Sequence, residues 1–230
     1  MIEILPNSIH WLFLITVIST LVLFFLSNKN SNKIMLLLVI WCIVQSVLVY
    51  RDFYQDTQTV PPKFILVLIP STLMIVLGLL PKQRDYRIKN RKIKVSTFLH
   101  TVRIPVEITL YSLFLHKLIP EELTFEGRNF DILAGLTAPI IGYLYLKNKI
   151  GVNVLLTWNV ICLFLVIFVL FNGILSAELP FQQFGFEQPN VAIKYFPFVL
   201  LPALIVPIVI YTHIIDILKL LNAKASRYKV

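Results

Sequence analysis

The sequence predicts an all-α membrane protein with seven transmembrane helices, its N-terminus outside and its C-terminus in the cytoplasm. Hydrophobic residues make up 57% of the 230 residues and charged residues only 14%, whereas soluble domains carry about 25% charged residues. The mean hydropathy is +0.80. The apolar residues fall into runs long enough to cross about 30 Å of hydrocarbon as helices. Because a helix satisfies its own backbone polar groups in lipid, these runs predict membrane spans.

The seven runs define one continuous transmembrane domain over residues 1–230. The first run is not a signal peptide, because no basic residue precedes it and no small-residue cleavage site follows it. The fifth run is short and carries Pro139, and the fourth carries charged residues. The predicted spans are residues 9–27, 34–50, 64–80, 97–120, 131–146, 150–176 and 196–221.

The charged residues predict the orientation of the spans. The loop 81–94 is strongly basic, and the other segments on its side are also basic, whereas most acidic residues lie in the opposite segments. Basic loops stay in the cytoplasm, so the chain is expected in the cytoplasmic (inner) membrane. This topology accounts for the net charge of +9 without nucleic-acid binding. The basic residues of the loop are Lys82, Arg84, Arg87, Lys89, Arg91, Lys92 and Lys94.

Similarities between spans suggest an internal repeat. The second and sixth spans follow the same Asn-Lys-Ile start and carry Trp41 and Trp158 at nearly equal spacing. The third and seventh each hold a phenylalanine six residues before a proline. One interpretation is two parallel three-helix repeats, 1–80 and 131–230, joined by a linker helix over 97–120. Chance similarity between apolar helices is the alternative.

Two resemblances accompany this pattern. The segments Glu-Gly-Arg-Asn-Phe-Asp at 126–131, Gln-Pro-Asn at 188–190 and Phe-Pro-Phe at 196–198 are similar to segments of an uncharacterised bacterial seven-span membrane protein family. This resemblance covers most of the chain from Arg103 onward and implies no known activity. The three-one-three layout also resembles that of SWEET-type carriers, although their proline–glutamine signature is not visible here.

A polar stripe marks the fourth span. Arg103 and Glu107 lie about 9 Å and 15 Å into the bilayer from the cytoplasmic side, and His100 and Tyr111 share their helix face. A charge at the centre of a span costs about 2.5–3.5 kcal/mol, so the stripe is expected to face the bundle interior. The i, i+4 spacing allows Arg103 and Glu107 to pair. Pro105 is expected to free a backbone carbonyl one turn earlier.

Other spans place polar side chains at a similar depth. With the stripe, they predict a polar layer for ligand binding or proton coupling, in which Glu107 titrates. The competing interpretation is a paired network that only fixes the register of the helices. The additional residues of this predicted layer are Gln45, Trp158, Asn159, His213 and Asp216.

The outer loops form a second candidate binding region. They are rich in aromatic, amide and charged residues, which favours a packed lid over the outer mouth. Interfacial anchoring is the alternative, and Asp131 suits the first turn of the fifth span. The candidate outer-mouth residues are Glu126, Arg128, Asn129, Asp131, Gln183, Glu187 and Asn190.

No cofactor, metal site or catalytic residue is predicted. Cys42 and Cys162 both lie within predicted spans, and we interpret them as buried packing residues. The four histidines are scattered in depth, and the last span has no central lysine for a retinal Schiff base.

Three functions remain open. The first is a small-molecule carrier or ligand-binding protein centred on Arg103 and Glu107. The second is a membrane-embedded enzyme acting on a lipid-like substrate, which we rank lower because neither HExxH nor GxSxG is present. The third is a non-catalytic subunit or sensor that docks a partner through the basic loop. The lipid bilayer itself is the expected partner, and the sequence predicts no particular oligomeric state.

Overall fold

The computed structural model describes residues 2, 4–29, 31–57 and 59–227, and within these residues it contains helices and two isolated β-bridges. The prediction of an all-α protein is thus confirmed. The helices, in order, are α1 (Asn7–Ser27), α2 (Asn32–Tyr50), α3 (Ile65–Gly78), α4 (Pro81–Asn90), α5 (Ile93–Leu99), η1 (His100–Val102), α6 (Arg103–Leu115), η2 (Glu121–Leu123), α7 (Ile132–Leu146), α8 (Val152–Leu175), η3 (Ala192–Lys194), η4 (Leu201–Ile205) and α9 (Val206–Arg227).

Several of these helices are long and apolar enough to cross a membrane. Five candidate spans lie within the described residues: α1, α2, α5 to α6 (Ile93–Leu115), α8, and η4 to α9 (Leu201–Ala225). A sixth arises if α3 and α4 are counted together across their bend of 78°. The fifth predicted span, residues 131–146, corresponds to α7, an apolar helix of 15 residues that is shorter than the candidate spans. The chain is therefore an all-helical, membrane-embedded protein.

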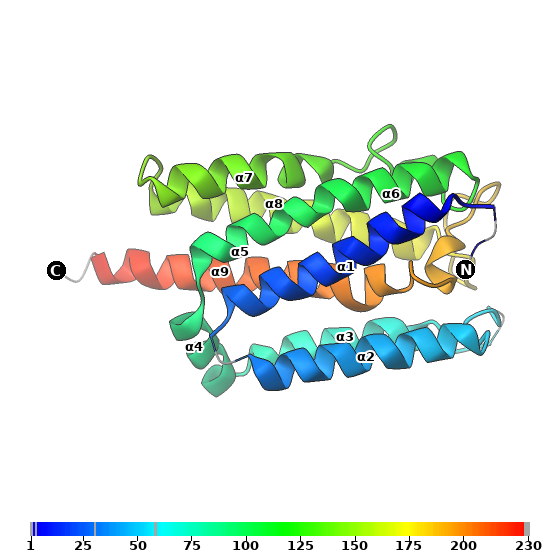
Figure 1. Cartoon of the computed structure of the whole chain (residues 1–230), viewed down its shortest axis with the longest axis horizontal. Coiled ribbons are helices and arrows are strands. Elements are labelled where there is room, and N and C mark those ends of the chain that lie inside the picture. Colours follow the sequence, from blue (N-terminus) through cyan, green and yellow to red (C-terminus); the bar gives the residue numbers. More distant parts are fainter. Residues whose placement is uncertain (1, 3, 30, 58, 228–230) are drawn as a thin grey trace.

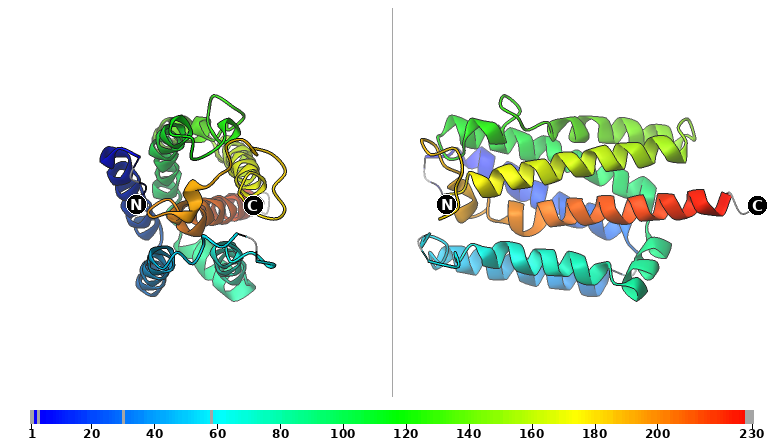
Figure 2. Two further views of the ribbon diagram at one scale, coloured as in Figure 1. Left: turned by 90° about the vertical axis from the view of Figure 1, so that its right-hand side faces the viewer. Right: turned by 180° about the vertical axis from the view of Figure 1, so that it is seen from behind.

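The long helices run side by side along one axis (Figure 1). The continuous helix η4 to α9 packs against α8 and also contacts α3, α4 and α5. Helices α2 and α3 form a pair at one side of the bundle, apart from α7 and α8 (Figure 2). The N-terminus lies at one end of the bundle, and the C-terminus and α4 lie at the other.

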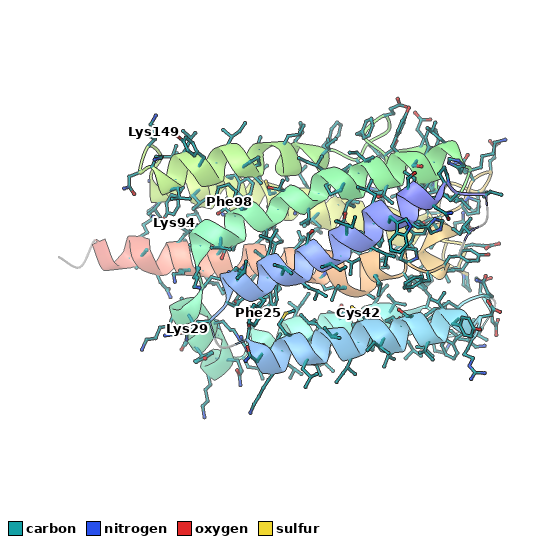
Figure 3. The ribbon with its side chains drawn as sticks, viewed as in Figure 1. Phe25, Lys29, Cys42, Lys94, Phe98 and Lys149 are labelled. Carbon is teal, nitrogen blue, oxygen red and sulfur yellow. The ribbon has the colours of Figure 1, made fainter. Side chains whose placement is uncertain are left out.

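The basic segment 81–94 is largely a helix, although the sequence predicts a loop there. Leu80 is extended, with φ −57° and ψ 141°, and Pro81 begins α4. The residue before a proline avoids the helical region, so the chain turns between α3 and α4 instead of continuing straight. Lys29, Lys94 and Lys149 all lie toward the end of the bundle that carries α4 (Figure 3).

Prolines interrupt two of the long helices near their polar groups. Pro105 has no N–H for the carbonyl of Thr101, and the helix tightens into the 3₁₀ turn η1 just before it. Pro207 likewise cannot bond the carbonyl of Ala203 within the π-helical segment η4. That free carbonyl accepts hydrogen bonds from Trp41 Nε1 at 3.1 Å and Ser71 Oγ at 2.9 Å, which fastens α2 and α3 to η4.

Candidate functional site

The polar stripe of the fourth span faces the bundle interior. His100, Arg103 and Glu107 expose 0%, 2% and 1% of their surfaces. Tyr111, the last member of the stripe, is only partly buried, and its hydroxyl donates to Glu126 Oε1 at 2.9 Å. The helical face predicted from spacing alone is therefore the buried face, while Tyr111 belongs to the outer rim.

Arg103 is held by three neighbouring helices. Its Nη1 lies 3.0 Å from Asp131 Oδ1 at the start of α7, and its Nη2 lies 3.0 Å from His213 Nε2 on α9. Both terminal nitrogens also point at the carbonyl of Cys162 on α8, at 3.4 Å. The expected i, i+4 ion pair with Glu107 is replaced by the pair with Asp131. The guanidinium extends across to α7, so its counter-charge comes from another helix.

Glu107 is covered by Asn129 of the outer loop. Asn129 Nδ2 lies 2.9 Å from each carboxylate oxygen of Glu107 and also donates to the carbonyl of Leu123. Its Oδ1 accepts from the backbone N–H of Asp131 at 2.9 Å. Asp131 occupies the N-cap position of α7 without a side-chain capping bond. Two residues assigned to the outer mouth thus join the Arg103 cluster.

A histidine pair completes the cluster toward α8 and α9. Arg103 can only donate, so His213 Nε2 must accept, and His213 Nδ1 then donates to Asn159 Oδ1 at 2.9 Å. The amide of Asn159 in turn donates to the carbonyl of Leu155. His100 stacks on His213 with ring centroids 3.8 Å apart. These bonds fix one neutral tautomer of His213.

Trp158 borders the histidine pair. Its ring centroid lies 5.6 Å from that of His100 and 5.8 Å from that of His213. Its indole N–H donates to Thr137 Oγ1 at 2.9 Å. Trp158 is therefore an aromatic wall whose polar atom is already bonded to α7.

Several buried polar atoms of the cluster have no hydrogen-bond partner. They are both ring nitrogens of His100, Nε of Arg103 and Oδ1 of Asp131, which contacts Arg103 as an ion pair but not as a hydrogen bond. Oγ1 of Thr212, the chain neighbour of His213, is also without a partner. The unpaired atoms of His100 and Arg103 lie beside the same pair of rings, because His100 stacks on His213 and Arg103 contacts His213 Nε2. Thr212 points about 100° away from His213 around α9. Within the described residues, no three His, Cys, Asp or Glu side chains are arranged to hold a metal ion.

Asp216 belongs to a second buried cluster instead of the predicted layer. Its Oδ1 accepts from Arg91 Nε at 2.8 Å, and its Oδ2 accepts from Ser96 Oγ at 2.5 Å. Lys219 Nζ, one turn further along α9, donates to the backbone carbonyl of Arg91 at 2.6 Å. Asp216 thus ties α9 to the junction between α4 and α5.

Arg91 is a buried residue of this cluster that the sequence does not single out. Its side chain is buried, and its Nη1 also donates to Ser27 Oγ at 3.0 Å and Asn28 Oδ1 at 3.1 Å at the end of α1. The sequence shows Arg91 only as one of seven basic residues in 81–94. Nothing in that run distinguishes the one arginine that turns inward.

Gln45 also lies outside the Arg103 cluster. It is fully buried on α2, and its Oε1 accepts from the Tyr54 hydroxyl at 2.7 Å. Tyr54 lies in the loop after α2, and burial raises its pKa to about 12. This hydrogen bond connects the loop between α2 and α3 to the buried face of α2.

The remaining outer-mouth residues do not converge on one site. Arg128 stacks on the ring of Phe184 at 4.5 Å, while Gln183 and Glu187 are exposed. Asn190 is buried and donates to the carbonyl of Gly173 at 3.1 Å. Residues 177–200 nevertheless pack over the helix ends, because Gln188 Nε2 donates to the carbonyls of Phe114 and Ile119.

The fold and the two clusters define the class of the protein. It is an all-helical, membrane-embedded protein with two buried charged networks, one around Arg103 and one around Arg91 and Asp216. Residues 59–221 match the model of a family described as a domain of unknown function (DUF8737), and the chain belongs to that family. No curated protein and no solved structure matches the chain. The matched range contains the Arg103 cluster and, apart from Ser27 and Asn28 on α1, the cluster around Arg91 and Asp216. The predicted membership of an uncharacterised family is confirmed.

Proposed function

We propose that the chain is a small-molecule carrier or ligand-binding membrane protein whose site is centred on Arg103 and Glu107. In this proposal it crosses the inner membrane seven times, with α7 as a short span, the N-terminus outside and α4 in the cytoplasm. The gathering of Lys29, Lys94 and Lys149 toward the α4 end supports that orientation.

The observation that carries the proposal is a charge mismatch in the buried cluster. Arg103 supplies one positive charge, whereas Glu107 and Asp131 supply two carboxyl groups. An uncompensated buried charge costs several kcal/mol, at roughly the level measured when one partner of a buried pair is removed. A bound proton or the cationic group of a substrate balances the second carboxylate, which gives Glu107 its role as the titratable group.

Unpaired polar atoms support a polar ligand. Leaving a buried donor or acceptor without a partner costs about 1–3 kcal/mol. His100 and Arg103 have such atoms beside the histidine pair. A small molecule with both donor and acceptor groups would satisfy them, with Trp158 as an aromatic wall.

The two polar clusters suit an alternating-access carrier. Asn129 covers Glu107 from the outer loop, and Arg91 joins Asp216 at the α4 end. In our proposal these contacts are the outer and inner closures on either side of the site. A carrier would release one closure at a time, because each is a discrete set of hydrogen bonds.

The test is a thermal-stability screen of the detergent-purified protein against sugars, amino acids, organic acids and small amines. A ligand that binds only the folded state raises the melting temperature by mass action. We expect the shift to persist in Glu126→Gln, which changes an exposed rim residue, and to vanish in Glu107→Gln. Transport of the same ligand into vesicles should follow the same pattern. A shift of equal size in folded Glu107→Gln would refute the site.

A further inference from the structure

A cavity separate from the Arg103 cluster lies between the α2 and α3 pair and the helices α1, η4 and α9. Its volume is about 390 Å³, within the range of about 300–1,000 Å³ typical of ligand pockets. Its walls are mostly apolar side chains, including Phe24, Leu38 and Met74. At the α4 end, Gln83 and Arg87 line its rim.

Trp41 and Ser71, two polar side chains that line the inner part of this cavity, are already paired. Trp41 Nε1 and Ser71 Oγ both donate to the carbonyl of Ala203, which Pro207 leaves free. A sugar or an amino acid would lose its hydrogen bonds to water here without equivalent replacements. A hydrocarbon chain gains from burial against carbon atoms, so the cavity favours an acyl chain.

The rim offers a positive charge to the head of such a ligand. Arg87 is partly buried on α4, its guanidinium lies 5.6 Å from the Tyr86 ring centroid, and it forms no ion pair within the described residues. Arg84, three residues earlier, instead pairs with Asp85 at 3.0 Å. A guanidinium without a carboxylate partner is suited to a phosphate.

We propose that this cavity binds one acyl chain of an anionic phospholipid, with the lipid phosphate on Arg87. The outer faces of α2 and α3 expose apolar side chains such as Leu36, Ile43 and Leu73, so bilayer lipid surrounds the cavity walls. The proposal is independent of the carrier function, because none of the residues that line this cavity belongs to the Arg103 cluster.

The test uses Trp41 as a reporter, since it lines the cavity. The protein, with the exposed Trp11 changed to Phe, is held in neutral detergent and titrated with brominated phosphatidylglycerol or brominated phosphatidylcholine. A brominated chain in the cavity quenches Trp41 fluorescence, and a Trp41→Phe variant gives the background from Trp158. We expect phosphatidylglycerol to quench at lower concentration than phosphatidylcholine.

Two matched pairs of variants decide the result. Arg87→Ala should lower the preference for the anionic lipid about fivefold, which is the factor that corresponds to roughly 1 kcal/mol per basic residue. Arg84→Ala removes the same charge and should have little effect. Met74→Trp should fill the cavity and expel the lipid, whereas Leu73→Trp should not, because Leu73 does not line the cavity. Native mass spectrometry measures the bound lipid in both variants. Equal effects within either pair, or equal quenching by both lipids, would overturn the proposal. Circular dichroism confirms that each variant is folded.

Discussion

Arg91 and Asp216 lie 125 positions apart in the chain and form an ion pair in the bundle, Nε to Oδ1 at 2.8 Å, with side-chain exposures of 0% and 1%. Through Arg91, the ends of α1 and α4 are fixed to α9. A buried pair of this kind is weak evidence for net stability, but removing one partner is costly because the other charge stays buried.

Asp216→Asn should therefore destabilise the protein strongly. Arg91 would keep its charge without the carboxylate, which costs about 3–5 kcal/mol and lowers the melting temperature by roughly 6–20 °C. Asp85→Asn is the matched control, because Asp85 pairs with Arg84 on the exposed face of α4. Thermal unfolding in detergent checks both variants. Similar melting temperatures for the two would show that the buried pair does not hold the helices together.

Energetic coupling between Arg103 and Asp131 is the second prediction. A double-mutant cycle with Arg103→Gln and Asp131→Asn should give a coupling energy of about 0.5–3 kcal/mol, because the residues share one buried ion pair. The control cycle uses Lys63→Gln and Asp56→Asn, a more exposed pair at 2.8 Å, where about 1 kcal/mol or less is expected. Denaturant unfolding supplies the four free energies of each cycle. Additive effects at Arg103 and Asp131 would contradict the pairing.

The outer loop that carries Asn129 and Asp131 depends on a glycine. A Cβ added at Gly127 would overlap the backbone carbonyl oxygen of Glu121, whereas one added at Gly151 would meet nothing within 4 Å. Gly127→Ala should cost about 1–3 kcal/mol, as overpacking of a rigid site does, and Gly151→Ala much less. Melting temperatures of the two variants check this. A tolerated Gly127→Ala would mean that the loop can move without disturbing Asn129.

The sequence was most informative where structure depends on local pattern. Within the described residues, hydropathy located the five candidate spans, the bent pair of α3 and α4, and the shorter apolar helix α7. The spacing of His100, Arg103 and Glu107 identified their buried face. The partners of these residues depend on tertiary packing and were less accessible. Spacing suggested Glu107 as the counter-charge of Arg103, but the bundle brings Asp131 there from the next helix.

The density of basic residues in 81–94 explains why two other features, the helix α4 and the buried Arg91, differ from the prediction. The basic segment 81–94 predicted which end of the bundle is cytoplasmic, an orientation that stays a prediction, but its excess of charge concealed a helix. It also made Arg91 look like its neighbours, because inward rotation depends on where the segment meets α1 and α9. Asp216 and Gln45 were placed by depth alone, and depth does not determine which side of the bundle a residue faces.

Alkaline pH should weaken the loop after α2 through Tyr54. Burial raises its pKa to about 12 in the folded protein, whereas an unfolded tyrosine titrates near about 10. Below the unfolded value both states are protonated, so the contribution of Tyr54 to stability is fully present. As pH rises from about 10 toward 12, the unfolded state loses its proton first, and unfolding becomes progressively easier.

The Tyr54→Phe variant separates this effect from general alkaline damage. At neutral pH it should lose about 1 kcal/mol, because the hydrogen bond to Gln45 Oε1 at 2.7 Å is removed. Its loss of stability between about pH 10 and 12 should then be shallower than that of the parent protein, since no phenol at this position can ionise. Thermal unfolding at stepped pH, with Tyr50→Phe as an exposed control, measures both quantities. Parallel pH profiles for Tyr54→Phe and the parent would show that the Tyr54 hydroxyl is not protected by the fold.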